Sequence, residues 1–124
     1  SLPVISSLAA DDEGKIYNIN ADTIAAEVAV SLRAEKLILL TDVNGIFLDP
    51  KDPATRLDRL SIAEAESMIK DGKATGGMIP KLENLIEILR RGVRSAHIIG
   101  GTQRNGILAE VFTDEGLGTM LSAE

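Results

Sequence analysis

The sequence predicts a single α/β domain over residues 1–124, built as three layers with a mainly parallel sheet between helices on both faces. Short apolar runs without polar alternation, at residues 37–40 and 96–99, are typical of strands buried in a parallel sheet. Segments with apolar residues three and four apart separate these runs, as amphipathic helices require. A chain of 124 residues can bury one hydrophobic core, and we find no linker that divides it.

The first part of the chain is expected to form a strand, a helix and a second strand. Val4–Ser7 is a candidate buried strand, and residues 11–14 form a polar turn. Asn20 is a typical N-cap for the helix. A strand, a helix and the strand at residues 37–40 together predict a right-handed crossover. The helix carries one apolar stripe: Ile24, Ala25, Val28, Ala29 and Leu32.

The second part is expected to hold three helices and two strands. Residues 49–59, with two prolines and several charges, should form a surface loop. Ser61 and Glu64 predict a capping box for a helix over residues 62–71, which Gly72 ends. Another helix should begin near Pro80. A strand at residues 96–99, a short helix around residues 107–111 and a strand near residues 119–121 complete the order.

Composition limits the classes of function. The formal charge is -6 and the basic residues are scattered, so nucleic acid is not an expected partner. The absence of cysteine suits a reducing cytoplasm, and one histidine cannot build a catalytic triad or a histidine metal site. No apolar run approaches the ~20 residues of a membrane span. The opening Leu2–Ile5, without an initiator Met, predicts a segment of a longer protein.

Two amides and a carboxylate cluster where the first helix begins. Asn18 and Asn20 can donate hydrogen bonds to a ligand carboxylate, and Asp22 can orient an ammonium group or a metal-bound water. An Asn cap followed by an acidic residue, which the helix dipole favours, explains the same pattern without a ligand.

The second candidate site follows the strand at residues 37–40. Thr41 and Asp42 lie where open α/β sheets bind ligands, and they suit phosphate-linked Mg²⁺ or ribose. Asn44 and Gly45 permit a tight turn near a ligand, although Asn-Gly is equally a plain turn signal.

The third candidate is a glycine-rich approach to a helix, from Lys73 to Lys81. Free amides at a helix start attract anions, and Gly76 and Gly77 permit close approach by phosphates. The helix dipole disfavours Lys81 in the first turn, and a bound phosphate would explain this residue. A lysine that points to solvent is the alternative, and the segment lacks the spacing of a Walker loop.

Taken in order, these segments resemble the amino-acid kinase family, and most closely its N-acetylglutamate kinase branch. The resemblance covers nearly the whole chain. It also extends the fold expectation to the carboxy-terminal, nucleotide-binding half of an amino-acid kinase or carbamate kinase-like protein. The matching segments are Tyr17–Asp22, Lys36–Gly45, Gly76–Lys81, Ala96–Ile99 and Phe112–Thr119.

The resemblance implies transfer of the ATP γ-phosphate, with Mg²⁺, to the side-chain carboxylate of N-acetyl-L-glutamate in arginine biosynthesis. Asn18 would hold acetylglutamate, supported by Asn20. Asp22 would position two catalytic lysines, of which Lys81 is one. No protein-held metal is expected. The nucleotide would contact Thr41, Asp42, Val43, Asn44, Gly45, Ile46, Phe47, Lys73, Ala74, Thr75, Gly76, Gly77 and Met78.

In this family the other lysine, the phosphate loop and most of the acetylglutamate pocket come from an amino-terminal lobe. The chain alone is therefore expected to be catalytically incomplete, and an unpaired sheet edge makes a homo-oligomer expected. Three further residues, His97, Glu110 and Gly116, match arginine-binding positions of feedback-inhibited members. A related acyl or carbamate substrate, or a binding module without chemistry, remain the alternatives. A module without chemistry would not need both Asp22 and Lys81.

Overall fold

The central sheet of the computed structural model, which describes residues 1–112 and 116–123, has four strands in the order β3-β7-β8-β6. β3 pairs with β7 and β6 with β8 in parallel, whereas β7 and β8 are antiparallel. The predicted mainly parallel sheet is therefore confirmed. Its strands are β3 (Lys36–Thr41), β6 (Arg59–Ser61), β7 (Ser95–Gly100) and β8 (Thr119–Ser122).

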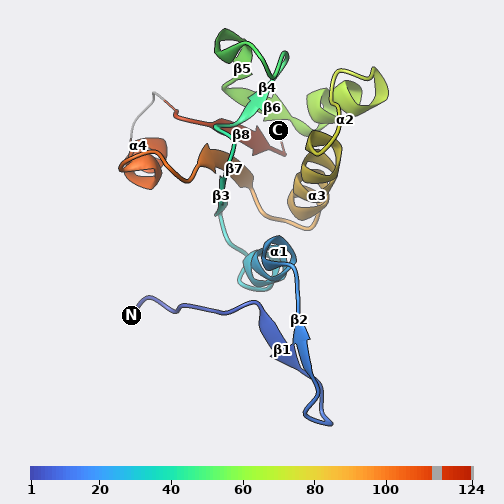
Figure 1. Cartoon of the computed structure of the whole chain (residues 1–124), viewed down its shortest axis with the longest axis vertical. Coiled ribbons are helices and arrows are strands. Elements are labelled where there is room, and N and C mark those ends of the chain that lie inside the picture. The colour runs from blue at the N-terminus through green and yellow to red at the C-terminus, as the bar shows by residue number, and fades with distance from the viewer. Residues whose placement is uncertain (113–115, 124) are drawn as a thin grey trace.

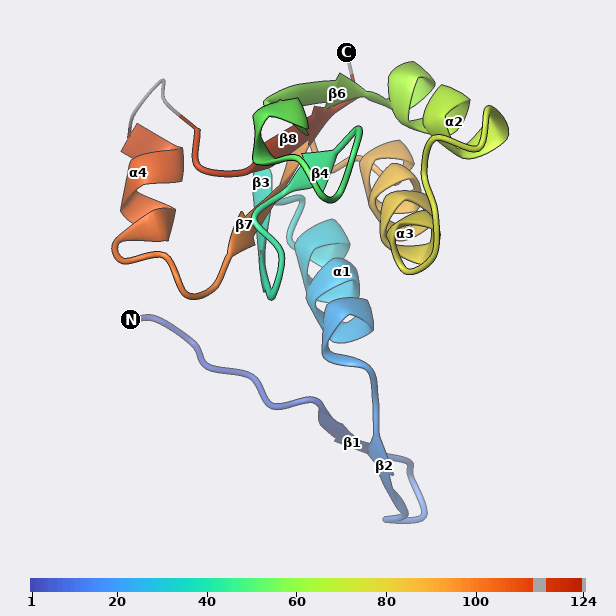
Figure 2. The same ribbon diagram turned by 45° about the horizontal axis from the view of Figure 1, so that its top comes forward.

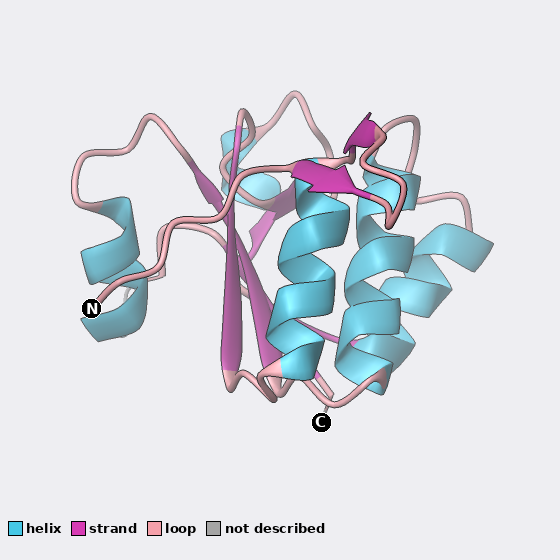
Figure 3. Ribbon diagram, turned by 90° about the horizontal axis from the view of Figure 1, so that it is seen from below, coloured by secondary structure: helices cyan, strands magenta, loops and turns pink. Residues whose placement is uncertain are grey.

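Helices cover both faces of this sheet (Figure 3). α4 (Gly106–Phe112) lies on one side, and α1 (Ala21–Ser31) and α3 (Met78–Arg90) lie on the other. α2 (Ile62–Lys70) packs against α3, where Met68 shares a core cluster with Leu82 and Leu85. The predicted three layers are thus confirmed. None of the helices in the described ranges is long and apolar enough to cross a bilayer.

The predicted strand at Val4–Ser7 is wrong. Val4 is 92% exposed, and the first strand is β1 (Leu8–Ala10), which pairs with β2 (Ile16–Asn18) in an antiparallel hairpin beyond α1 (Figure 1). The predicted crossover is also wrong, because the parallel neighbour of β3 is β7. Apolar residues before Ser7 have no strand to pair with, whereas the polar turn that follows closes the hairpin.

Asp11 organises that hairpin turn. Its carboxylate accepts hydrogen bonds from the amides of Glu13 and Lys15 and from the hydroxyl of Tyr17. The Lys15 amide and then the Tyr17 hydroxyl hold the pKa of Asp11 below its usual value, because hydrogen bonds to a carboxylate favour its charged form. Gly14, at φ 82°, takes the left-handed conformation that the turn requires.

The Asn20 cap of α1 is confirmed, but its buried face differs from the expected one. The Asn20 side chain accepts hydrogen bonds from the amides of Asp22 and Thr23. Ala26 and Ala29 are buried against the sheet, whereas Leu32 is 74% exposed. α1 is apolar around most of its surface, so residue spacing alone does not show which side meets the sheet.

Strand β3 lies at one end of the strand order, and it is not buried on both faces as predicted. Leu37 is buried but Leu40 is 55% exposed. β7, which has a neighbour on each side, is buried along its whole length as expected.

The predicted loop at residues 49–59 contains short strands. β4 (Ile46–Phe47) pairs with β5 (Arg56–Leu57) around a 3₁₀ turn at Pro53–Thr55, and β6 begins at Arg59. Strands of two or three residues are too short to show a period in the sequence. The prolines and charged residues from which a loop was predicted belong in part to the turn that joins β4 to β5.

The later elements agree with expectation. The capping box of α2 is complete, since Ser61 and Glu64 exchange hydrogen bonds of 2.8 and 3.1 Å. α3 begins two residues earlier than predicted, which places Pro80 third in the helix. The first turn has no internal partners for its amides, so the missing N–H of Pro80 costs no hydrogen bond there. The predicted short helix and last strand correspond to α4 and β8.

Candidate functional site

The amino ends of α1 and α3 meet at the carboxyl ends of β3 and β7 (Figure 2). Each helix precedes its strand and runs back along it, so both amino ends lie at the same edge of the sheet. Between them lies a hollow of about 250 Å³, here called the α1–α3 hollow. Two positive helix ends at one edge favour an anionic ligand. The hollow is lined by Asn20, Asp22, Thr23, Leu39, Thr41, Pro80, Lys81, Asn84 and Ile98.

The α1 side of the hollow carries two of the predicted residues. Asn20 uses its side-chain oxygen to cap the helix, so its amide nitrogen remains available to a ligand. Asp22 is in the first turn, where the helix dipole favours a carboxylate. The cap explanation and the ligand explanation are therefore compatible, since different atoms serve each. Asn18 lies at the end of β2, exposed, and does not line the hollow.

The α3 side brings Lys81 to the hollow. Its Nζ lies 3.8 Å from Oδ1 of Asp42, which follows β3, and the Lys81 side chain is 36% exposed. Asp42 is almost fully exposed, so water screens this contact and it contributes little to stability. Lys81 lines the same hollow as Asp22 and Thr41, and more than a third of its side chain is in contact with solvent.

Sequence reasoning missed Asn84, which also lines the hollow and is half-buried. A usable signal was present, since residues three apart on a helix share one face and Asn84 follows Lys81 by three. Thr23, next to Asp22, was missed as well.

The turn after β3, residues 41–47 and here called the nucleotide turn, is held by several close contacts. The Thr41 hydroxyl donates to the carbonyl of Val43 at 2.7 Å. The Asn44 side chain packs on Gly100, where a Cβ would meet its Oδ1 at 1.6 Å. Gly45 has φ 126°, which an L side chain rarely adopts. Ile46 is 2% exposed, and its amide donates to the buried hydroxyl of Thr119.

The glycine-rich approach to α3 contributes backbone rather than side chains. Lys73 and Thr75 are exposed, and neither lines the α1–α3 hollow. Ala74 is 2% exposed and belongs to the core. Gly76, at φ 57°, and Gly77 lead into the helix with nothing within 4 Å of the position of a Cβ. The open side of this segment gives a phosphate room beside the amides of the first turn.

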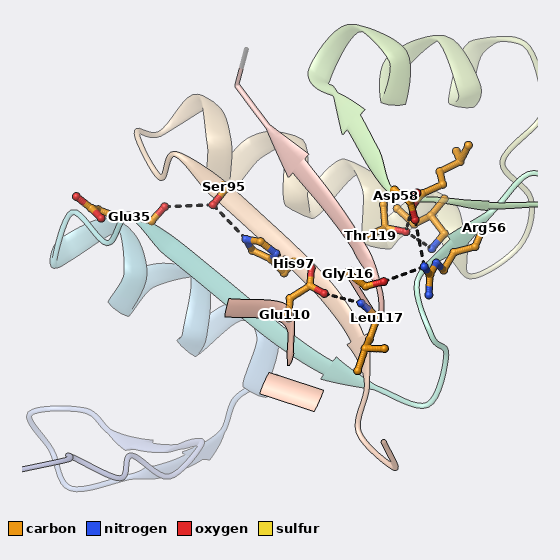
Figure 4. Close-up of polar contacts among 11 residues, drawn as sticks. Glu35, Arg56, Asp58, Ser95, His97, Glu110, Gly116, Leu117 and Thr119 are labelled. Atoms are coloured by element: carbon orange, nitrogen blue, oxygen red, sulfur yellow. Dashed lines mark hydrogen bonds and ion pairs between the residues drawn. The ribbon is translucent and has the colours of Figure 1, made fainter. Parts of the chain in front are cut away.

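A second cluster joins β7, α4 and the approach to β8 (Figure 4). His97 Nδ1 lies 2.9 Å from Oε1 of Glu110, and the amide of Leu117 donates to Oε2 of Glu110 at 2.9 Å. A Cβ on Gly116 would lie 3.3 Å from that oxygen. The structure thus brings together the three residues predicted as an arginine site. Residues 113–115 of the last matching segment lie outside the described residues.

The described residues include no group of three His, Cys, Asp or Glu side chains that could hold a metal ion. Mg²⁺ commonly reaches such sites bound to phosphates and keeps several of its waters. Asp42, exposed beside Lys81, suits contact with such a hydrated ion. A phosphorylated ligand could be positioned at this edge of the sheet by Lys81, by the amino ends of α1 and α3, and by the carboxylates of Asp22 and Asp42.

Comparisons with known proteins give matches over most of the chain. The amino acid kinase family matches residues 1–100. Acetylglutamate kinase of Thermosynechococcus vestitus is 58% identical over 120 residues, which cover 97% of this chain and 41% of that protein. The chloroplastic acetylglutamate kinase of Arabidopsis thaliana is 51% identical over 121 residues, 98% of this chain and 35% of that one. This chain therefore spans about 40% of the length of such relatives.

A solved structure is also similar. N-acetylglutamate synthase from Neisseria gonorrhoeae, complexed with coenzyme A and L-arginine, matches with a TM-score of 0.83 and 33% identity. The match covers 97% of this chain and 27% of that one. Sequence and fold lead to one family, and the residues that converge on the α1–α3 hollow lie within the matched range. The chain belongs to the amino acid kinase family.

Proposed function

We propose that this chain supplies the ATP-binding part of an enzyme that phosphorylates the side-chain carboxylate of N-acetyl-L-glutamate. The observation that carries the proposal is the meeting of Asp22 and Lys81 in one hollow at two helix amino ends. These residues come from positions far apart in the chain, and a module without chemistry would not need both. Identities of 50–58% to proteins named acetylglutamate kinase support the choice of substrate.

The residues divide the work as follows. An oxygen of the substrate carboxylate attacks the γ-phosphorus, the bond to the β–γ bridging oxygen breaks, and ADP leaves with that electron pair. Lys81 stabilises the negative charge that grows on the leaving phosphate, and Asp22 orients the lysine ammonium. Asn18, exposed at the end of β2 and two residues before the cap of α1, holds the acetylglutamate, and Asn20 supports that contact. Bound Mg²⁺ supplies further neutralisation of phosphate charge.

The nucleotide lies against two backbone segments in this proposal. The nucleotide turn and the approach to α3, residues 73–78, present amides and glycines where a phosphate can come close. Both segments are at the carboxyl edge of the sheet, where ligands of open α/β folds bind. We place the nucleotide-binding domain over residues 1–124. A cytoplasmic location stays a prediction.

The rest of the active site belongs to the larger part of the relatives' chains, which the match does not include. The outer edge of β3, with exposed Leu40, suits pairing with a strand of that part, an amino-terminal lobe. A hollow of about 360 Å³ beside that edge is mostly apolar and lined in part by Ile24, Val28 and Leu32. The exposed stripe of α1 therefore has a role as a contact surface, either for this lobe or in a homo-oligomer.

Joining the part of the Thermosynechococcus vestitus enzyme that precedes the matched stretch to this chain tests the proposal. The joined protein should form ADP only when both Mg-ATP and N-acetyl-L-glutamate are present. Glutamate, N-acetyl-L-aspartate and carbamate, tested in parallel, separate the acetylglutamate activity from related ones. A folded joined protein that binds Mg-ATP and forms ADP equally well with another of these acceptors would contradict the substrate assignment.

We also propose that His97, Glu110 and Gly116 bind the guanidinium of L-arginine. A carboxylate offers about four acceptor positions, and among the described residues Glu110 uses one for His97 and one for Leu117. The similar synthase structure complexed with L-arginine supports this choice of ligand. Because the Glu110 side chain is 5% exposed, entry requires α4 to move.

Millimolar L-arginine should raise the melting temperature of the chain, whereas the uncharged analogue L-citrulline should not, because a ligand that binds the folded state stabilises it. Glu110→Gln keeps the size of the side chain but loses its charge, and it should abolish the shift. An equal shift in this variant would place arginine elsewhere, and the absence of any shift in the parent chain would refute the arginine site.

A further inference from the structure

Thr119 lies fully buried where the nucleotide turn, β5 and β8 meet. Its hydroxyl oxygen accepts a hydrogen bond from the amide of Ile46 at 2.8 Å and donates one to the carbonyl of Leu57 at 2.5 Å. Ile46 and Leu57 face each other across the β4–β5 pair. One hydroxyl therefore bridges the two strands, and it also ties them to the central sheet.

The nucleotide turn comes unusually close to this hydroxyl. A Cβ on Gly45 would lie 2.7 Å from Thr119 Oγ1 and 3.2 Å from the Thr119 amide nitrogen. Only a glycine leaves room for this approach, and Gly45 also needs its positive φ. The backbone of the turn is thus in direct contact with the first residue of β8.

Thr119 itself has little freedom to move. Its neighbour Gly118 lies against β7, where a Cβ would meet the carbonyl oxygen of Ile98 at 1.9 Å. At the other end of the segment, Arg56 donates to the carbonyl of Gly116 at 2.9 Å, and Leu117 donates to Glu110 (Figure 4). Residues 116–119 are therefore held along their length, and they give the nucleotide turn a rigid support.

We propose that Thr119 is a positioning residue for nucleotide binding. It does not contact the nucleotide, but its hydroxyl holds the backbone of Gly45 and Ile46, so that Thr41 and Asp42 keep their places beside Lys81. This inference rests on the proposed function of the nucleotide turn. It adds a residue that is buried, lies in β8 and is distant in sequence from the residues assigned to the nucleotide above.

Calorimetric titration of Mg-ATP into the joined protein tests the proposal with two substitutions. Thr119→Val keeps the shape of the side chain but removes both hydrogen bonds, so the turn loses its anchor. We expect a loss of affinity of about tenfold, the effect of roughly one net hydrogen bond. Thr119→Ser restores the hydroxyl and should bind within about threefold of the parent protein.

A matched control separates positioning from general destabilisation. Val93→Ala removes volume from the second core cluster, which α1 packs on and which contains no residue of the nucleotide turn, and it should lower the melting temperature with unchanged affinity for Mg-ATP. Should Thr119→Val fail to fold, Thr119→Cys replaces it, because a thiol donates and accepts only weakly. Unchanged affinity in the folded Val or Cys variant would overturn the proposal.

Amide hydrogen exchange gives a readout that needs no nucleotide. The Ile46 amide should be protected in the parent and Ser proteins and should exchange faster than its core neighbours in Thr119→Val. If the parent protein binds no Mg-ATP, the proposed function fails, and the exchange data alone then decide whether Thr119 holds the turn. Equal protection of Ile46 in the Val variant would refute that role.

Discussion

Lys81→Met in the joined protein should lower kcat for phosphoryl transfer by about 10²- to 10³-fold, the loss typical when one charge-stabilising group is removed. Methionine has a similar length but no charge. The negative charge that grows on the phosphates of the departing ADP therefore loses the cation that stabilises it. Folding should be little affected, because the ion pair that Lys81 makes among the described residues is with the exposed Asp42 at 3.8 Å. A coupled assay of ADP formation, together with a thermal melt, measures both quantities.

Lys70→Met is the matched control for this change. Lys70 ends α2, is exposed and lies outside the α1–α3 hollow, so its replacement removes the same charge without touching the site. The control should keep kcat within about twofold, which corresponds to less than 0.5 kcal/mol. A loss below tenfold for Lys81→Met, with the control unchanged, would remove Lys81 from the catalytic assignment.

Gly118→Ala should destabilise the chain by about 3 kcal/mol or more, at the upper end of the cost of overpacking. The added methyl would lie 1.9 Å from the carbonyl oxygen of Ile98 and 2.6 Å from a side-chain carbon of Ile99. Both atoms belong to the buried centre of β7, so relief requires the β7–β8 pair to separate. Urea unfolding followed by circular dichroism measures the loss.

Gly100→Ala provides the comparison, since its methyl would meet a side chain rather than backbone. The nearest atom is Oδ1 of Asn44, which can rotate away. We expect this variant to lose no more than about 1.5 kcal/mol in stability while it weakens Mg-ATP binding, because Asn44 belongs to the nucleotide turn. Equal stability losses at the two glycines would show that the β7–β8 contact is less rigid than the structure indicates.

The sequence predicted those residues of the candidate site whose type is notable at their position in a helix. Lys81 in a first turn is unusual because the helix dipole disfavours it, and Asp22 stands beside two amides at the start of α1. The structure places both residues at one hollow. Asn84 and Thr119 escaped detection because an amide on a helix and a threonine in a strand are ordinary in a sequence. Their positions matter only through contacts with residues distant in the chain, such as Ile46 and Leu57.

The sequence by itself determined the fold class, the helices and most of their ends. Helix caps, glycine stops and the periodic spacing of apolar residues act through hydrogen bonds and packing within a few residues. They can therefore be recognised in the sequence without knowledge of any tertiary contact. Only the tertiary structure decided that β3 lies at an edge, that α1 buries Ala26 and Ala29, and that Val4 stays exposed. Each of these depends on which distant segment is present as a partner, and no local pattern carries that information.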